Sequence, residues 1–242
     1  IQVDSITVTR EINRIPWAKV VILDGNASSE NFQASNDALF IPGKKIEVKC
    51  GYQSDNYTIF KGLITKMTVK THAGGSSILI LECRDETVKM TIGRKSKYFI
   101  QVKDSDIISQ ITGAYGSFST TVEATKVTHK EVVQYNCTDW DFIVARAEAN
   151  GKICFADDGQ LSIKAPDLSQ SPALSLQYGA TMLEFDAEID ARNQLKNITS
   201  KAWNYTDQKL LETEAADPNV TLNGNLTSAD MAKVAGPDKF IL

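Results

Sequence analysis

The chain has 242 residues, of which 42% are hydrophobic and 23% are charged, and this composition excludes disordered, collagen-like and coiled-coil proteins. At about 100 to 200 residues per domain, the length allows one large domain or two smaller ones. The 26 basic and 30 acidic residues leave a net charge of -4. Because a nucleic-acid binder needs a basic surface, we expect no nucleic-acid partner.

No membrane span or metal site is predicted. No apolar run approaches the roughly 20 residues that a span requires, and the start of the chain lacks the charged and apolar regions of a signal peptide. Without an initiator methionine, the chain is expected to be a trimmed piece of a longer protein. Cys50, Cys83, Cys137 and Cys154 lie far apart with no C-x-x-C pair, so we predict isolated thiols, with one disulfide pair as the alternative and no zinc site.

The first ninety residues are expected to form β-structure, because apolar residues alternate or cluster in short β-branched runs between turn-forming residues. The predicted strands are Ile6–Thr9, Trp17–Leu23, Lys45–Gly51, Tyr57–Thr71 and Ser77–Arg84. The glycine-bearing stretch 73–76 predicts a hairpin between the last two strands. Gly62 predicts a bulge or bend inside a long strand, which lets a sheet curl. A small antiparallel barrel is therefore expected.

The pattern changes after Gly93 and predicts a compact α+β unit. The triplet at 104–106 precedes apolar residues at helical spacing and predicts a short capped helix. Thr138 and Asp141 form a variant capping box for a second helix, in which Trp140 shares the apolar face and Asn150-Gly151 is the stop signal. A strand at 131–135 precedes this helix, and strands at 152–156 and 161–165 follow it around an Asp-Gly turn.

A stretch rich in proline and serine at 165–172 marks a boundary. Beyond it, Met182–Arg192 alternates between apolar and charged residues, which predicts a strand with one polar face, and Asn197–Asn204 is its expected antiparallel mate. After Glu212 the chain becomes polar and rich in turn residues, so partial order is expected there.

The charged side of this predicted strand is an acidic row, formed by Glu184, Asp186, Glu188 and Asp190. Alternate strand positions would place these carboxylates about 6 to 7 Å apart, as acid–base chemistry or a hard cation requires. No glycine loop, histidine or nucleophile accompanies the row, so we interpret it as a solvent-facing surface. A surface that faces a water-filled lumen is the further alternative.

No catalytic, cofactor-binding or metal-binding residue is predicted, and we expect the protein not to be an enzyme. His72 and His129 are the only imidazoles and are interpreted as ordinary exposed or edge residues. The sequence contains no Gly-x-Ser-x-Gly elbow and no phosphate-binding glycine signature. The basic cluster Arg94–Lys97 is interpreted as a solvated turn.

Seven N-x-[ST] triplets would suit a glycosylated ectodomain, but we interpret them as a product of an Asn- and Thr-rich composition. They begin at Asn26, Asn56, Asn136, Asn197, Asn204, Asn219 and Asn225.

Three stretches resemble the tail-hub family that includes VgrG proteins of type VI secretion, phage late control gene D proteins and the hubs of contractile phage baseplates. The first is Phe40–Val48 with Gly51-Tyr52 and Ile59–Ile64, similar to the family's first barrel. The second runs from Glu131 to Gly151 and resembles the family's strand and "S-D-W-D-F" helix, with Thr138 in place of serine. The third is the hairpin Asp157–Leu161.

The resemblance implies an α+β fold that is mainly β: a tube-like antiparallel β-barrel, a small α+β domain and the start of a second barrel. It places the first barrel at residues 1–92, the intervening domain at 93–170 and the first part of the second barrel at 171–242. Three chains of the full-length protein form a pseudo-sixfold ring in that family. Only the opening strands of the second barrel fit before Leu242, so a spike is expected downstream or in another chain.

The sequence leaves two alternative functions open. The resemblance implies a structural hub that docks on the inner tube of a contractile injection machine and carries the puncturing tip or effectors, with no cofactor. Its expected partners are tail-tube (Hcp-like) subunits and spike or effector proteins. It would lie in the bacterial cytoplasm during assembly, then be ejected with the tube or remain in the phage baseplate.

The alternative is a secreted carbohydrate-binding β-module, since aromatic faces are common ligand platforms. Trp17, Trp140 and Trp203 discriminate between the two functions, and their apolar neighbours predict that all three are buried.

Overall fold

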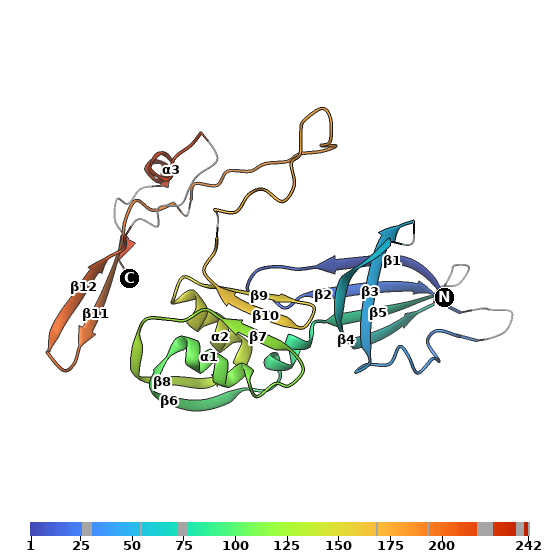
Figure 1. Ribbon diagram of the computed structural model, residues 1–242, viewed down its shortest axis with the longest axis horizontal. Coiled ribbons are helices and arrows are strands. Elements are labelled where there is room, and N and C mark those ends of the chain that lie inside the picture. Colours follow the sequence, from blue (N-terminus) through green and yellow to red (C-terminus); the bar gives the residue numbers. More distant parts are fainter. Residues whose placement is uncertain are drawn as a thin grey trace. The chain divides into compact units, whose positions relative to one another are not determined.

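The computed structural model describes residues 1–25, 31–53, 55–71, 77–167, 169–192, 194–216, 225–235 and 240–241. The fold is α+β and mainly β, as the sequence predicts (Figure 1). The chain divides into two compact units, Ile1–Pro166 and Asp167–Leu242, and this boundary falls within the stretch rich in proline and serine. None of the helices in the described residues is long and apolar enough to cross a membrane.

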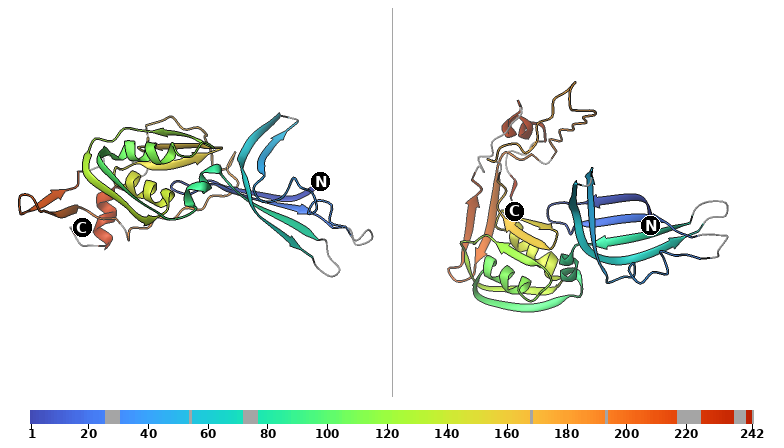
Figure 2. Two further views of the ribbon diagram at one scale, coloured as in Figure 1. Left: turned by 90° about the horizontal axis from the view of Figure 1, so that it is seen from below. Right: turned by 45° about the vertical axis from the view of Figure 1, so that its right-hand side comes forward.

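Five antiparallel strands form the first sheet, in the order β1-β2-β5-β4-β3. Their bounds are Gln2–Thr9 for β1, Trp17–Leu23 for β2, Lys45–Tyr52 for β3, Asp55–Lys70 for β4 and Ile78–Arg84 for β5. All five predicted strands are confirmed, and β1 begins four residues earlier than expected. The sheet curls into a half-barrel (Figure 2). Within the described chain, β1 and β3 have no further strand at their outer edges.

Alternation along the strands gives the first sheet one apolar and one polar face. The apolar face forms a core of ten buried residues, which are Ala18, Val20, Ile22, Ala34, Val48, Phe60, Ile64, Leu79, Leu81 and Cys83. On the opposite face Lys19, Glu82 and Lys66 lie side by side on β2, β5 and β4. Removing the apolar side chains from water is the main term that stabilises this sheet.

The bend in β4 does not arise at Gly62, where the sequence predicts it. The register shifts between Val48 and Lys49 on β3, and again between Ile64 and Lys66 on β4. Gly62 lies between these two bulges and serves a different purpose, because a Cβ there would lie 2.2 Å from the Arg84 carbonyl oxygen. The glycine therefore permits close approach of two backbones, and the bulges curve the sheet.

An α+β part completes the first unit. It comprises the 3-10 helix η1 (Glu86–Thr91), β6 (Lys95–Lys103), α1 (Asp104–Thr112), β7 (Ser119–Val122), β8 (Thr128–Cys137), α2 (Asp139–Glu148), β9 (Ile153–Asp157) and β10 (Gln160–Lys164). The strands form a β6–β8 pair and a β7-β10-β9 sheet, in which β7 and β10 are parallel. The helices lie between them (Figure 1), and the shared core includes Phe99, Ile107, Ile143 and Leu161.

The local signals for α2 and its following hairpin are confirmed. The Thr138 hydroxyl accepts the Asp141 backbone N–H at 3.1 Å, and Trp140 is buried in the core. Gly151 has a φ of +64°, the left-handed conformation expected of a helix stop. Asp158 and Gly159 have φ values of +48° and +83°, and both central positions of a type I′ hairpin turn require positive values.

Two predictions for the α+β part are wrong. Arg94–Lys97 is not a solvated turn, because β6 begins at Lys95 and pairs with β8. The predicted short helix is confirmed as α1, but it is not capped by the triplet 104–106: the N-cap is Lys103, which makes no side-chain cap bond. The Asp104 carboxylate instead turns into the protein, where it pairs with Arg146 of α2 and contacts His129 of β8.

The second unit contains β11 (Ile198–Asn204), β12 (Lys209–Glu214), α3 (Ser228–Ala235) and β13 (Phe240–Ile241), with the sheet order β12-β11-β13. The predicted strand at 197–204 is confirmed, but its antiparallel partner is β12. The predicted strand Met182–Arg192 is wrong, since this segment forms no ladder and its apolar side chains Leu183, Phe185 and Ile189 are exposed. Alternation alone cannot satisfy backbone N–H and C=O groups when no strand pairs with them.

Candidate functional site

No catalytic or metal constellation is found in the part of the chain that the structure describes. Groups of His, Cys, Asp or Glu that could hold a metal are absent there. Cys50, Cys83, Cys137 and Cys154 are free thiols, as predicted, and burial raises the pKa of Cys83 to about 11. His72, the predicted turn at 73–76 and the triplets at Asn26 and Asn219 lie outside the described residues.

His129 belongs to a charged cluster and is not an ordinary edge residue. Its Nε2 lies 2.7 Å from Asp104 Oδ2, and Arg146 donates to both oxygens of the same carboxylate, at 2.6 and 2.9 Å. Asn150 adds a fourth contact at 2.9 Å. Burial alone would raise the pKa of Asp104, but the hydrogen bonds from Arg146, Asn150 and His129 outweigh it and hold the pKa at about 2. The cluster ties α1 to α2 and β8.

A second buried carboxylate, Asp139, ties α2 to the β6–β8 pair. Gln134 donates to one oxygen at 2.8 Å, and Lys95 and the Tyr115 hydroxyl donate to the other, each at 2.6 Å. Burial opposes ionisation, yet the bonds from Gln134, Lys95 and Tyr115 lower the pKa of Asp139. Lys95, at the start of β6, therefore neutralises a buried anion of α2.

The acidic row does not form one face of a strand, because 182–192 adopts no strand. Its members Glu184, Asp186, Glu188 and Asp190 are exposed. Asp190 pairs locally with Arg192, whose Nη2 lies 2.6 Å away, and hydrogen bonds from the Arg192 side chain and backbone lower the pKa of Asp190. The interpretation as a solvent-facing surface fits this exposure.

The three tryptophans differ in burial. Trp140 is buried and Trp17 is half-buried, but Trp203 is 51% exposed. The prediction that all three are buried is therefore wrong for Trp203. It lies opposite Leu210 on the β11–β12 hairpin, and Leu210 is also exposed. A two-stranded hairpin offers no second layer that could cover either side chain.

The most extensive polar contacts within the first unit connect the sheet to the α+β part. We call this group of residues, Arg10, Asn13, Lys61, Asp85 and Asp158, the joint. Asp158 lies in the β9–β10 turn, and its Oδ1 accepts from Arg10 at 3.1 Å and from the Lys61 backbone N–H at 2.8 Å. The next turn residue, Gly159, donates its N–H to Asp85 at 2.9 Å. The Asp-Gly turn is thus bound to β1, β4 and β5.

Asn13 makes the second half of the joint. Its backbone N–H donates to the Cys154 carbonyl and its side-chain oxygen accepts from the Cys154 N–H, both at 2.8 Å. Its side-chain nitrogen donates to Glu148 on α2 at 2.9 Å. Buried Asp85 also accepts from the Thr87 N–H at 2.8 Å and caps η1, directly after β5.

The hydrogen bonds of the joint hold the sheet and the α+β part of the first unit together. The sequence signals Asp158 only as a turn residue and does not single out Arg10, Asn13 or Asp85. No local pattern could identify their contacts in the joint, because the partners in those contacts lie 49 to 148 residues away along the chain.

The comparisons agree on the fold. A tail protein from Neisseria meningitidis MC58 superposes with a TM-score of 0.65 at 17% identity, covering 94% of this chain and 68% of that chain. The 43 kDa tail protein of prophage MuSo2 from Shewanella oneidensis superposes with a TM-score of 0.67 at 13% identity, covering 98% and 68%. A chain of the Francisella PdpA-VgrG complex gives a TM-score of 0.51 at 15% identity, covering 90% of this chain and 38% of that chain.

At these identities the likeness shows a shared fold of the tail-protein type, over nearly the whole chain. Among curated proteins, none matches the sequence. A family model described as the Alg8 N-terminal domain matches residues 1–242, which is the full length of the chain. The chain therefore belongs to the Alg8 N-terminal domain family.

Proposed function

We propose that this chain is the hub portion of a contractile injection machine, related to the VgrG and late control gene D proteins. The observation that carries the proposal is the fold, which it shares with tail proteins over 94% and 98% of its length. In this function residues 1–92 are the first tube-like barrel, 93–170 the intervening domain and 171–242 the first part of a second barrel. The full-length protein is a homotrimer.

The joint supports a mechanical function. A hub must transmit the push of the tube without separating its domains, and charge-assisted hydrogen bonds between Arg10, Asp85, Asp158 and their partners resist such separation. The second unit supports the same proposal through its small number of buried apolar side chains. Among its described residues Ala232 is the only buried hydrophobic one, so its apolar side chains need further protein to cover them.

The partners follow from the proposal. The ring docks on the inner tube, made of Hcp-like subunits, and carries a spike tip or effectors on its other side. It assembles in the bacterial cytoplasm and leaves with the tube, or remains in the virion baseplate if the particle is a phage. No enzymatic activity or cofactor forms part of this function.

Cosedimentation with tubes tests the proposal. Tubes polymerised from the tail-tube subunit encoded in the same genome are mixed with the full gene product, and the bound protein is counted. The proposal predicts saturation at three chains per tube end, independent of tube length. Binding that increases with tube length, or no binding, would contradict it.

The carbohydrate-binding alternative depends on the exposed aromatic side chain of Trp203. A glycan array probed with the same protein separates the two functions. The hub proposal predicts no glycan signal that depends on Trp203, whereas a signal lost in Trp203→Ala would favour the alternative.

A further inference from the structure

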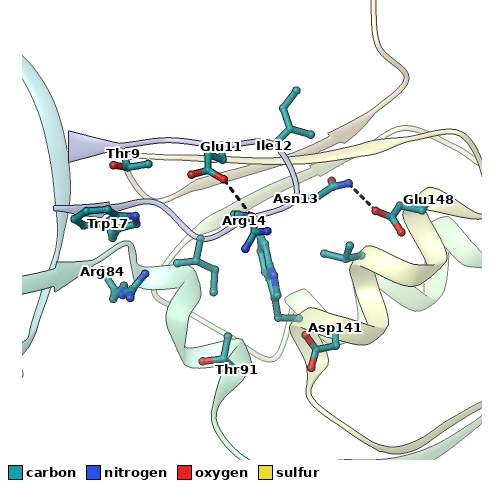
Figure 3. Close-up of a pocket in the computed structure, with 13 residues that line it drawn as sticks. Thr9, Glu11, Ile12, Asn13, Arg14, Trp17, Arg84, Thr91, Asp141 and Glu148 are labelled. Atoms are coloured by element: carbon teal, nitrogen blue, oxygen red, sulfur yellow. Dashed lines mark hydrogen bonds and ion pairs between the residues drawn. The ribbon is translucent and has the colours of Figure 1, made fainter. Parts of the chain in front are cut away.

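A polar pocket of about 910 Å³ lies in the first unit, between the β1–β2 connection, the end of β5 and helix α2. Figure 3 shows its wall, with Trp17 and Arg84 on the side of the sheet and Asp141 and Glu148 on α2. Asn13 fixes the connecting loop to β9 and to Glu148, so the walls are held in place by the joint. The hub function uses none of the pocket's side chains except Asn13.

The pocket's charges are paired with one exception. Glu11 lies 3.1 Å from Arg14, Glu148 accepts from Asn13 at 2.9 Å, and Asp141 accepts from the Thr138 hydroxyl at 2.7 Å. The side chain of half-buried Arg84 makes no hydrogen bond or salt bridge with any described residue, and its charge interacts with Glu82 only through space. Glu82 lies two residues before Arg84 on the same face of β5, and its carboxylate is already hydrogen-bonded to Lys66 at 2.9 Å. A guanidinium in this setting favours an anion from outside the chain.

The charges of the other residues that line the pocket indicate which kind of anion Arg84 can bind. Three carboxylates and two guanidiniums line the wall, so the pocket as a whole carries a net negative charge and disfavours a polyanion such as a nucleotide. A single carboxylate matches the planar fork of one arginine, which can donate two parallel hydrogen bonds to it. The pocket therefore suits a ligand with one carboxylate.

The apolar part of the wall indicates what the carboxylate is attached to. Trp17 lies directly opposite Arg84 in the β2–β5 register, and Ile12 is a 54% exposed side chain on the connecting loop. A volume of about 910 Å³ is large for a free small acid, since pockets of about 300 to 1,000 Å³ take drug-sized ligands. The carboxylates of Glu11 and Glu148 can accept backbone N–H groups. These features are those of a peptide site.

We propose that this pocket binds a peptide segment of a partner protein, with one carboxylate on Arg84 and an apolar side chain against Trp17 and Ile12. The carboxylate belongs either to an Asp or Glu side chain or to the C-terminus of the partner. The proposal stands on the pocket alone, and its test uses the 242-residue chain without tubes. Failure here would leave the hub function intact, and failure of tube binding would leave this site intact.

The probes are synthetic peptides selected from a random peptide library displayed against the chain. Calorimetry then compares each peptide with its amide form, in which Glu becomes Gln or Asp becomes Asn, and with a form whose C-terminus is amidated. Losing a charge-assisted hydrogen bond is expected to weaken binding about 10- to 100-fold. The form that shows this loss identifies the source of the carboxylate.

Protein variants give the complementary test. Arg84→Met removes the charge and should weaken the carboxylate peptide about 10- to 100-fold, while leaving the affinity of the amide peptide unchanged. Lys66→Met is the matched control, because Lys66 is a cation on the same sheet face outside the pocket, and it should bind like the wild type. Arg84→Lys, which keeps the charge without the fork, should lie between them.

Three results would overturn the proposal: no selected peptide binds in calorimetry, the amide peptides bind as tightly as the carboxylates, or Arg84→Met binds like the wild type. If Arg84→Met fails to fold, as a thermal melt would show, the peptide substitutions still decide the matter.

Discussion

Two buried carboxylates, Asp104 and Asp139, fix the helices of the α+β part to its strands. Each carboxylate accepts hydrogen bonds from three side chains. One of the three donors is a cation on a different element: Arg146 for Asp104 and Lys95 for Asp139. A buried carboxylate is tolerated only when such partners replace water. The same residues are therefore stabilising while paired and strongly destabilising when one partner is removed.

Arg146→Met should lower the free energy of unfolding by about 3 to 5 kcal/mol near neutral pH, because it leaves Asp104 buried without its bidentate cation. Arg14→Met is the matched control, since Arg14 forms an exposed pair with Glu11 and should cost about 0 to 1 kcal/mol. Denaturant titration measures both. Equal losses in the two variants would contradict the role given to Arg146.

The same cluster predicts a specific acid sensitivity. A carboxyl whose folded-state pKa is about 2, against about 3.9 in the unfolded chain, stabilises the fold above pH 4 and loses this contribution as the pH falls through 2. The contribution is about 2 to 3 kcal/mol. The difference in unfolding free energy between wild type and Arg146→Met should therefore shrink by about this amount between pH 6 and pH 2. A constant difference would show that Asp104 is not the group responsible.

At the scale of elements, helix α2 connects the two sheets of the α+β part and also lines the pocket. It depends on its cap, Thr138, and on Trp140, which is 6% exposed. Thr138→Ala should cost about 0.5 to 2 kcal/mol and Trp140→Ala about 3 to 5 kcal/mol. Trp203→Ala provides the comparison, because a surface aromatic residue should change the unfolding free energy by about 0.5 kcal/mol or less. Losses near zero for both Thr138→Ala and Trp140→Ala would refute this account of α2.

The joint makes a second prediction at this scale. Asp158→Gly removes the acceptor for Arg10 and Lys61 without straining the positive φ of the turn, and should lower the unfolding free energy of the first unit by about 1.5 to 3 kcal/mol. Asp158→Asn, which keeps an acceptor and tolerates the turn, should cost less. Limited proteolysis should cut between the sheet and the α+β part faster in Asp158→Gly. If both variants had the same unfolding free energy and the same rate of proteolysis as the wild type, the mechanical role proposed for the joint would be contradicted.

The elements that the sequence predicts correctly have complete local signals. The five strands of the first sheet, helix α2 and the Asp-Gly hairpin each carry their own pattern, cap or turn residues. β6 is missed because its lysines resemble a solvated turn, and the buried partner of Lys95, Asp139, lies 44 residues away along the chain. Met182–Arg192 has the pattern of a strand but lacks a partner strand, which a sequence pattern cannot reveal.

The candidate sites were less predictable than the elements. The fold brings Arg10 and Asp85 to the β9–β10 turn and places Arg84 in the wall of the pocket. These contacts depend on the tertiary structure and have no signal in the neighbouring sequence. The resemblance to tail proteins is confirmed at the level of the fold. The contacts that give the first unit its mechanical coherence could not be read from any window of the chain.

At the scale of the whole molecule, the two units contrast in their cores. The first unit has two clusters of buried apolar side chains, one in the sheet and one in the α+β part. The second has exposed apolar side chains on its hairpin and on 182–192, including Leu183, Phe185 and Leu210. Exposed apolar surface of this extent is typical of an interaction site, so the proposed hub function predicts that further protein covers the second unit.

The central claim is that the chain forms part of a hub ring at the end of an inner tube. The most direct measurement is a cryo-electron microscopy reconstruction of the intact particle from the source organism. The account predicts three copies of this fold arranged as a ring against the last layer of tube subunits, with the exposed apolar residues of the second unit covered by protein. A particle that assembles completely without this chain, or that carries it along the length of the tube, would contradict the claim.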